Sequence, residues 1–269
     1  VAQRQGFFHW ELDFAPVFRR GGFDLQVGNP PWVRPDFDEA ATLAEFDVTW
    51  ALESKIATDR ARKLREATLA QQDARDFYLS ELRTVVATRE FVSSPQFYPH
   101  LIGLRPDLYR CFMERTWQHM SPHGIVALIH PESHFTDDKA GPLREATYRR
   151  LRRHWQFVNE LRLYEIHNLV AYGVHVYGIQ RAPTFLTASS LYHPDTVTRS
   201  LTHNADGPEP GLKDPDGQWD LRPHAKRIML VDEDVLASWH EMLESPGTPV
   251  RQTRMVYSVN SASASVLKR

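Results

Sequence analysis

Four consecutive residues, Asn29-Pro30-Pro31-Trp32, suit chemistry on the amino group of a nucleic acid base. The lone pair of such an exocyclic nitrogen is delocalised into the ring, so a catalyst must hold both N–H groups with acceptors before the nitrogen can attack an electrophile. The amide oxygen of Asn29 and the backbone carbonyl of Pro30 supply two acceptors, and the proline that follows fixes that backbone. Trp32 offers a flat face on which a base stacks.

A strand must deliver this loop. Phe23 to Val27 alternates apolar and polar residues and runs into Gly28 and the two prolines, which cannot continue a β-ladder. We therefore expect a short strand that ends in a rigid loop. The same four residues are also typical of a strand-terminating turn with a tryptophan in the core, so the rest of the chain has to distinguish the two interpretations.

The surrounding sequence predicts an α/β fold. Residues 38–90 are rich in Ala, Leu, Glu, Arg and Gln and contain no Gly or Pro, which predicts one long helix or a helical hairpin. After them, helices alternate with buried strands, and this order indicates a sheet covered on both faces. The expected elements are a helix capped by Asp107 that runs to about Met120, a strand over 125–129, a helix over 142–154, and strands over 157–164 and 174–179.

With these elements in place, the sequence resembles the N6-adenine DNA methyltransferases, whose catalytic loop is Asn or Asp, two prolines and an aromatic residue. The context Phe23-Asp-x-x-x-Gly-Asn-Pro-Pro-Trp32, preceded by Phe8-His-Trp-x-Leu-x-Phe14, is similar to the large single-chain enzymes of type IIG restriction and phage-exclusion systems. The similarity covers roughly residues 7–181, and residues 219–243 are similar to the segment after the catalytic domain in the phage-exclusion branch. Three further segments resemble family motifs: residues 107–114, 124–131 and 157–164.

The resemblance implies a Rossmann-like sheet, the cofactor S-adenosylmethionine, and methyl transfer to N6 of an adenine flipped out of double-stranded DNA. It implies that the segment from Asn29 to Trp32 is the catalytic loop and that Phe112 helps to line the cofactor pocket. Tyr164 is expected to stack on the flipped base. Tyr172 is the alternative, because the local spacing admits either register.

The composition shifts toward Pro, Gly, Asp and Thr over residues 182–223, which predicts irregular structure or short edge strands. A strand over 228–231 and a helix over 233–243 follow. We therefore expect residues 1–181 to form the catalytic half of a methyltransferase domain, with the helical segment inserted in it. Residues 182–269 are expected to form an irregular connector that leads toward a target-recognition region.

The sequence departs from this family at the cofactor site. The family places its Gly-rich loop, and the acidic residue that binds the ribose, before the catalytic loop, but no Phe-x-Gly-x-Gly pattern occurs anywhere in this chain. Two explanations stay open: the main cofactor loop lies on a segment outside this chain, or on a partner subunit of a split or decayed methyltransferase. The alternative function is a non-catalytic DNA-binding or assembly subunit of a defence complex that keeps the methyltransferase scaffold.

The charge balance restricts how DNA could be bound. Thirty-two basic and thirty-four acidic side chains give a formal charge of −2, so phosphate contacts need a local basic patch. The candidates are Arg149, Arg150, Arg152 and Arg153 late in an expected helix. A solvated face that interacts with the helix C-terminus is the other interpretation.

The same composition indicates a cytoplasmic protein. The single cysteine, Cys111, excludes a disulfide framework and suits a reducing compartment. No apolar run reaches the roughly 20 residues of a membrane helix, so we expect no membrane partner.

The thirteen histidines raise the question of a metal. The pairs His119/His123 and His130/His134 have a spacing that suits zinc when both members lie on one helix. A proline and a glycine interrupt the first pair, and the expected strand end at Pro131 separates the second. We therefore expect no metal site, and methyl transfer requires none.

Overall fold

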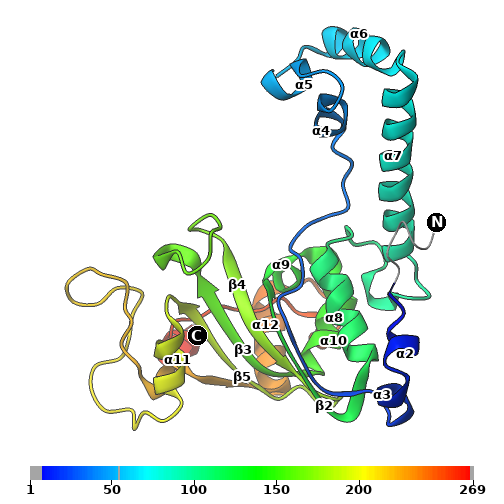
Figure 1. Ribbon diagram of the computed structural model, residues 1–269. Helices are drawn as coiled ribbons and strands as arrows, with labels where there is room; N and C mark the ends of the chain where they lie inside the picture. Colours follow the sequence, from blue (N-terminus) through cyan, green and yellow to red (C-terminus); the bar gives the residue numbers. More distant parts are fainter. Residues whose placement is uncertain (1–7, 54, 267–269) are drawn as a thin grey trace.

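The computed structural model describes residues 8–53 and 55–266. It contains a six-stranded mixed sheet with helices on both faces and an arm of helices that extends away from it (Figure 1). This is the mixed α/β fold with a helical insertion that the sequence predicts. The strands lie in the order β1-β2-β4-β3-β5-β6, in which β1/β2 and β3/β5 are parallel and the other pairs are antiparallel. Their bounds are Phe23–Gly28 (β1), Met120–Pro131 (β2), Leu151–Val158 (β3), Ala171–Tyr177 (β4), Phe185–Leu191 (β5) and Met229–Val231 (β6).

Strand β1 forms where its alternation predicts, and a glycine sets its position beside β2. Gly22, directly before the strand, has a φ of +117°, and a Cβ there would lie 2.5 Å from the carbonyl oxygen of His119. Only glycine combines that backbone conformation with such a close approach. The parallel pairing then places Gly28 opposite Leu128, so the residues after β1 leave the sheet at its carboxyl edge.

The sheet carries a hydrophobic core on each face. One core packs helices α8 (Leu108–Gln118), α10 (Gly141–Tyr148) and α12 (Glu233–Leu243) against residues such as Leu128 and Tyr177. The other core contains Phe157, Tyr172 and Val197, the last from α11 (Pro194–Ser200). The expected coverage of both faces is therefore confirmed.

The arm differs from its prediction. The described residues of 38–90 form neither one helix nor a hairpin but four helices, and polar side chains satisfy backbone groups at the start of the first helix and at the first break. Asp38 accepts a hydrogen bond from the Ala41 N–H, and Asp47 accepts one from the Thr49 N–H. The helices are α4 (Glu39–Ala44), α5 (Thr49–Leu52), α6 (Thr58–Leu69) and α7 (Gln72–Val92), the last of which returns toward the sheet (Figure 1).

Two predicted boundaries on the sheet side are also wrong. The helix expected over 142–154 ends at Tyr148, and β3 occupies 151–158 instead of 157–164. The polar residues His154 and Gln156 are buried in this strand, so its inward positions do not look apolar in the sequence. Asp107 precedes α8, but its carboxylate binds Arg34 and does not cap the helix.

The segment after Arg181 is more regular than expected. Strand β5 pairs with β3, and β6 pairs with β5, so both extend the same sheet and the predicted boundary does not coincide with its edge. The predicted strand at 228–231 and helix at 233–243 are confirmed as β6 and α12. The remaining helices are α2 (Trp10–Asp13), α3 (Ala15–Arg19), α9 (Ser133–Thr136) and α13 (Ser261–Val266), with short 3-10 turns at Pro99–Leu101, Asp138–Ala140, Asn159–Leu161, Ala225–Arg227 and Val250–Gln252.

Within the described ranges, 8–53 and 55–266, no helix combines the length and the apolar character that crossing a membrane requires.

Candidate functional site

The loop from Asn29 to Trp32 leaves the carboxyl end of β1 and is anchored at its far end. The Trp32 indole N–H donates to the Ile129 carbonyl on β2, at 3.3 Å, and the ring is half-buried. Pro30 is buried, whereas Asn29 is exposed. Among the residues that the structure describes, none forms a hydrogen bond with the Asn29 side chain. The loop is therefore held by its apolar residues while its amide stays available.

This loop contributes to two neighbouring cavities. Asn29, Pro30 and Pro31 line the first, of about 650 Å³, together with Phe112 from α8. Trp32 lines the second, of about 440 Å³, with Tyr109 and Pro131. The structure thus brings the predicted cofactor residue Phe112 to the same cavity as the predicted catalytic amide.

The first cavity has mostly apolar and aromatic walls. Its described lining holds no carboxylate and no Gly-rich turn, so a ribose binder of the expected kind is not among these residues. Burial raises the pKa of the Cys111 thiol, which also lines it, to about 12, so this thiol stays protonated. Chemistry through a cysteine nucleophile is therefore not supported at this site.

The second cavity is bordered by a charged cluster that sequence analysis missed. Arg34 donates to Asp107 at 2.6 Å, beside the buried guanidinium of Arg110. Arg110 donates to the Tyr109 hydroxyl at 3.1 Å and to Asp137 at 3.2 Å. The Arg110 Nη1 atom is buried with no hydrogen-bond partner among the described residues. The cavity wall therefore combines aromatic rings with charged side chains of both signs, Arg34, Asp36 and Asp107.

Both candidate stacking tyrosines lie near Trp32, but they differ in exposure. Tyr172, on β4, is only 2% exposed and stacks on Phe157 with ring centroids 5.6 Å apart. Tyr164 lies in the loop after β3, is half-buried, and is held by two backbone hydrogen bonds to the Asn159 side chain. The ring centroids of Trp32 lie 6.5 Å from Tyr164 and 6.0 Å from Tyr172. Tyr164 thus has the more accessible ring face.

The four arginines do not share one helix face. Arg149 and Arg150 follow α10, whereas Arg152 and Arg153 lie on β3. Arg150 stacks over Trp117 at 4.8 Å, and burial lowers its pKa to about 10.

Arg152 donates to the carbonyls of Arg150, Leu151 and Ile179, and Arg149 is half-buried. Arg153 alone among the four arginines is exposed. Internal contacts therefore engage two members of the predicted phosphate-binding cluster.

Neither histidine pair that the sequence suggests belongs to the possible metal-ligand group found among the described residues. His119 is buried, whereas His123 is exposed. Both ring nitrogens of His130 already have hydrogen-bond partners. Its Nδ1–H donates to the Pro131 carbonyl at 2.9 Å, and its Nε2 accepts from the Tyr177 hydroxyl at 2.8 Å. A different group, Glu132, His154 and His175, gathers its ligand atoms within 4.8 Å of one another. Strand pairing creates this group, so no local spacing could reveal it.

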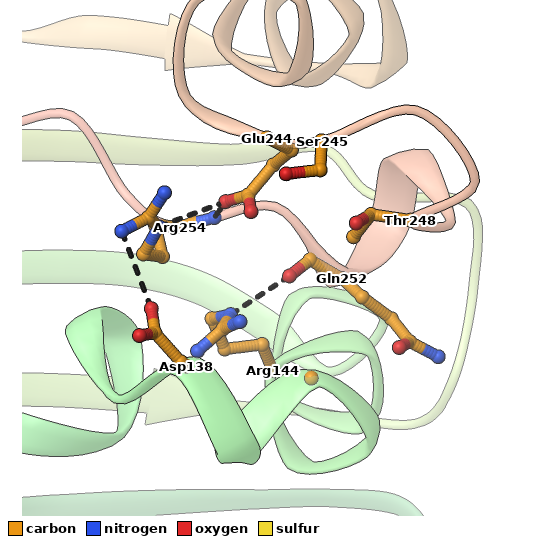
Figure 2. A pocket seen from close by; sticks show the side chains of 8 residues that line it. Asp138, Arg144, Glu244, Ser245, Thr248, Gln252 and Arg254 are labelled. Carbon is orange, nitrogen blue, oxygen red and sulfur yellow. Dashed lines mark hydrogen bonds and ion pairs between the residues drawn. The ribbon is translucent and has the colours of Figure 1, made fainter.

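A third cavity, of about 330 Å³, lies between α10 and the segment after α12 (Figure 2). Arg254 donates to Glu244 at 3.1 Å and forms an ion pair with Asp138 at 3.2 Å. Arg144 donates to the Gln252 carbonyl at 2.9 Å. Figure 2 shows these charges paired across the cavity. These contacts connect the C-terminal segment to α10 and to the turn before it. The described lining of this cavity indicates no particular ligand.

Comparisons with known proteins give matches only among solved structures. No family model matches the chain, and a search of curated proteins finds no match. The chain is similar to the methyltransferase subunit of a type I restriction-modification system from Streptococcus thermophilus, at 11% identity and a TM-score of 0.35, over 64% of this chain and 35% of that one. It is also similar to the DNA-bound type ISP restriction-modification enzyme LlaBIII, at 9% identity and a TM-score of 0.32, over 62% of this chain and 10% of that one.

A third similar structure is the DrdV–DNA complex, at 13% identity and a TM-score of 0.34, over 66% of this chain and 16% of that one. The chain thus spans about a third or less of the length of each of these proteins.

Proposed function

We propose that this chain is the catalytic segment of an adenine-specific DNA methyltransferase, of the kind found in restriction-modification or phage-defence systems. The observation that carries the proposal is the placement of the Asn29 amide. It is exposed, it forms no hydrogen bond with the described residues, and it lines a cavity of about 650 Å³ at the carboxyl end of β1. Ligand sites typically occupy clefts of about 300–1,000 Å³.

The residues present suit one wall of a site for S-adenosylmethionine. Phe112 and its aromatic neighbours offer ring faces that attract an adenine or a sulfonium cation. The described lining holds no carboxylate, and we propose that the main cofactor loop lies outside this chain. When bound, this cofactor supplies an electrophilic methyl group.

The chain's own residues orient the acceptor amine. The Asn29 amide oxygen and the Pro30 carbonyl accept hydrogen bonds from the two N6 hydrogens of the target adenine, which turns the nitrogen lone pair toward the methyl group. Pro31 removes a competing backbone N–H and restricts the Pro30 carbonyl. The Ile129 contact of Trp32 keeps the loop in register with β2.

Stacking holds the flipped base. Trp32 and Tyr164 lie close enough to form one aromatic surface, and Tyr164 is its more exposed member. The Tyr172 ring packs against both of these rings, and its centroid lies 5.0 Å from that of Tyr164. We therefore assign base stacking to Tyr164 and a packing role to Tyr172. Arg153 and Arg149 are the members of the basic cluster with the fewest internal contacts, and we propose them as DNA phosphate contacts.

The test is transfer of a labelled methyl group from S-adenosylmethionine to duplex DNA by the complete protein, with any partner subunits it has. Nuclease digestion and chromatography identify the methylated nucleoside. N6-methyldeoxyadenosine that disappears in Asn29→Ala supports the proposal. A methylated cytosine, or labelled DNA that is equally abundant in the variant, contradicts it. DNA binding without any transfer would favour the non-catalytic subunit, for which the incomplete cofactor wall is the supporting observation.

A further inference from the structure

We propose that Glu132, His154 and His175 bind one divalent transition-metal ion, and that Zn²⁺ is the best match. This site is separate from the proposed methyl transfer, which needs no metal. Two of its ligand residues lie on neighbouring strands and the third directly follows a strand, and each is at most 7% exposed.

Strand register brings the ligands together. His154 on β3 lies directly opposite His175 on β4, so their side chains stand side by side on the same face of the sheet. Glu132 follows the last residue of β2, the strand that pairs with β4 on its other side. One carboxylate and two imidazoles therefore point into one small volume from three adjacent chain segments.

The contacts within the group are close but incompletely satisfied. His154 Nε2 lies 2.8 Å from Glu132 Oε2, and His175 Nε2 lies 3.0 Å from Glu132 Oε1. Despite that short distance, neither His175 Nε2 nor Glu132 Oε1 has a hydrogen bond with suitable geometry among the described residues. These two fully buried atoms are thus in ion-pair contact at 3.0 Å, but their geometry does not suit a hydrogen bond. Buried polar groups left in this way are often satisfied by an ion or a water.

A glycine leaves room for the carboxylate. Gly173 lies two residues before His175 on β4, and so on the same face of the sheet. A Cβ at this position would overlap Glu132 Oε1 and the His175 ring. The strand therefore omits a side chain at the point where the ligands converge.

The donor set selects the metal. Two imidazole nitrogens and one carboxylate oxygen are a known ligand set for Zn²⁺, which binds them at about 2.0–2.2 Å. In a tetrahedral site these bond lengths place neighbouring donor atoms about 3.3 Å apart. At present each imidazole Nε2 lies 2.8 or 3.0 Å from a different oxygen of the Glu132 carboxylate, and the ligand atoms of the group lie within 4.8 Å of one another, so the side chains would shift to reach this spacing. No thiolate takes part, because the single cysteine lines another cavity.

Hydrogen bonds around the group resemble the outer partners of metal ligands. His154 Nδ1 lies 2.8 Å from the Thr187 hydroxyl on β5, which can fix the ring orientation. The Tyr257 hydroxyl donates to Glu132 Oε2 at 2.8 Å. Tyr257 follows the segment that Arg254 and Arg144 tie to α10 (Figure 2), so this partner is held in place from two sides.

With three protein ligands, the ion would take a water molecule as its fourth ligand. No described cavity is lined by the three residues, so this water would be enclosed together with the ion. Its position still matters for the candidate active site. Glu132 lies between Pro131 and Ser133, both of which line the cavity beside Trp32. A metal at this point would fix the carboxyl end of β2, where the Ile129 carbonyl anchors Trp32.

The test uses the complete protein after dialysis against a strong chelator. Co²⁺ is titrated in, and its visible d–d absorption reports a four-coordinate site before Zn²⁺ displaces it. We expect one equivalent of Co²⁺ with strong visible bands, and a Zn²⁺-dependent rise in the midpoint of thermal unfolding. Weak bands, or no saturable binding, would overturn the proposal and leave the group as a hydrogen-bond network.

Variants locate the ion. Glu132→Gln keeps the side-chain shape but removes the charge, and we expect affinity to fall at least 100-fold, more than the roughly 10–100-fold typical of losing an outer partner. His123→Asn, which changes an exposed histidine, is the matched control and should bind like the unaltered protein. Equal binding by Glu132→Gln and the control would overturn the assignment. If Glu132→Gln does not fold, His175→Asn replaces it and should likewise lose at least 100-fold in affinity relative to the control. The strength of the visible Co²⁺ bands of the unaltered protein is then judged as above.

Discussion

The sheet and the helical arm are built on opposite principles. Long-range strand pairing and a hydrophobic core on each face stabilise the sheet, which also buries polar side chains. In the arm, the 21-residue helix α7 buries only Ala74 and Val92, and the helices are joined through Glu39. Most of the arm's side chains face solvent. The candidate sites therefore lie where distant segments of the sheet meet, whereas a few polar side chains join the helices of the arm.

Matched truncations of buried and exposed rings should show this contrast most strongly. Phe185→Ala removes a side chain that is 1% exposed on β5, and we expect the free energy of unfolding to fall by about 3–5 kcal/mol. Phe77→Ala on α7, where the ring is 39% exposed, should cost about 1 kcal/mol or less. Chemical denaturation with two spectroscopic probes measures both. Similar losses would mean that the arm is part of the cooperative core.

Asn29→Ala at the sheet edge should lower the methylation rate, whereas an equivalent change on the arm should not. We expect loss of this proposed acceptor to cost about 100-fold or more in rate, while DNA affinity stays within a few-fold because the proposed role of Asn29 is to orient the base and not to bind phosphate. Gln72→Ala, an amide truncation on the exposed arm, is the control and should leave the rate unchanged. Single-turnover methyl transfer with saturating DNA is the measurement. A normal rate in Asn29→Ala would remove this residue from the mechanism.

The aromatic residues at the sheet edge allow a finer distinction. Tyr164→Ala should weaken binding of the extruded base by about 1–3 kcal/mol, whereas Tyr164→Phe should be nearly neutral because only the ring face is used. Tyr172→Ala should act mainly through folding, since its ring is buried. The fluorescence of 2-aminopurine at the target position reports stacking. If only Tyr172→Ala alters that signal and the methylation rate, the stacking role belongs to Tyr172.

The smallest expected effect concerns the carboxylate that joins three helices of the arm. Burial alone raises the pKa of Glu39, but hydrogen bonds from Arg65 and Tyr78 outweigh it and lower this pKa below its usual value. The charged form is thus favoured in the folded arm. Its stabilisation is complete above the carboxyl's ordinary pKa and is lost as the pH falls through the lowered value.

We expect this partly exposed network to contribute about 1 kcal/mol or less. Amide hydrogen-exchange protection factors in α6, measured at neutral and acidic pH, should therefore decline modestly on acidification. In Glu39→Gln, that decline should be absent. An unchanged decline in the variant would show that other groups cause it.

Local signals predicted the local structure well. The alternation before Gly28 and the two prolines after Asn29 act within a few residues, and both β1 and its rigid loop are present. The break before α5 was missed because it depends on a weak local hydrogen bond, from the Thr49 N–H to Asp47. The start of β3 was missed because His154 looks like a surface residue in the sequence.

The site was predictable to a similar extent. The structure places Asn29 and Phe112 on one cavity, and their roles in catalysis and cofactor binding stay predictions. Arg150 was wrongly grouped on a helix, since the aromatic ring on which it stacks lies far away in the sequence. Glu132 and its histidine neighbours have no recognisable spacing, because only the pairing of β2, β3 and β4 brings them together.

Strand β1 has one more consequence, for the behaviour of the chain in concentrated solution. It lies at the end of the sheet, pairs only with β2 within the described residues, and exposes Leu25 and Val27 by 64% and 75%. Backbone groups along such an edge can recruit another strand with little regard for its side chains. Self-association through this strand would therefore survive most point substitutions, whereas a proline at position 25 would interrupt it.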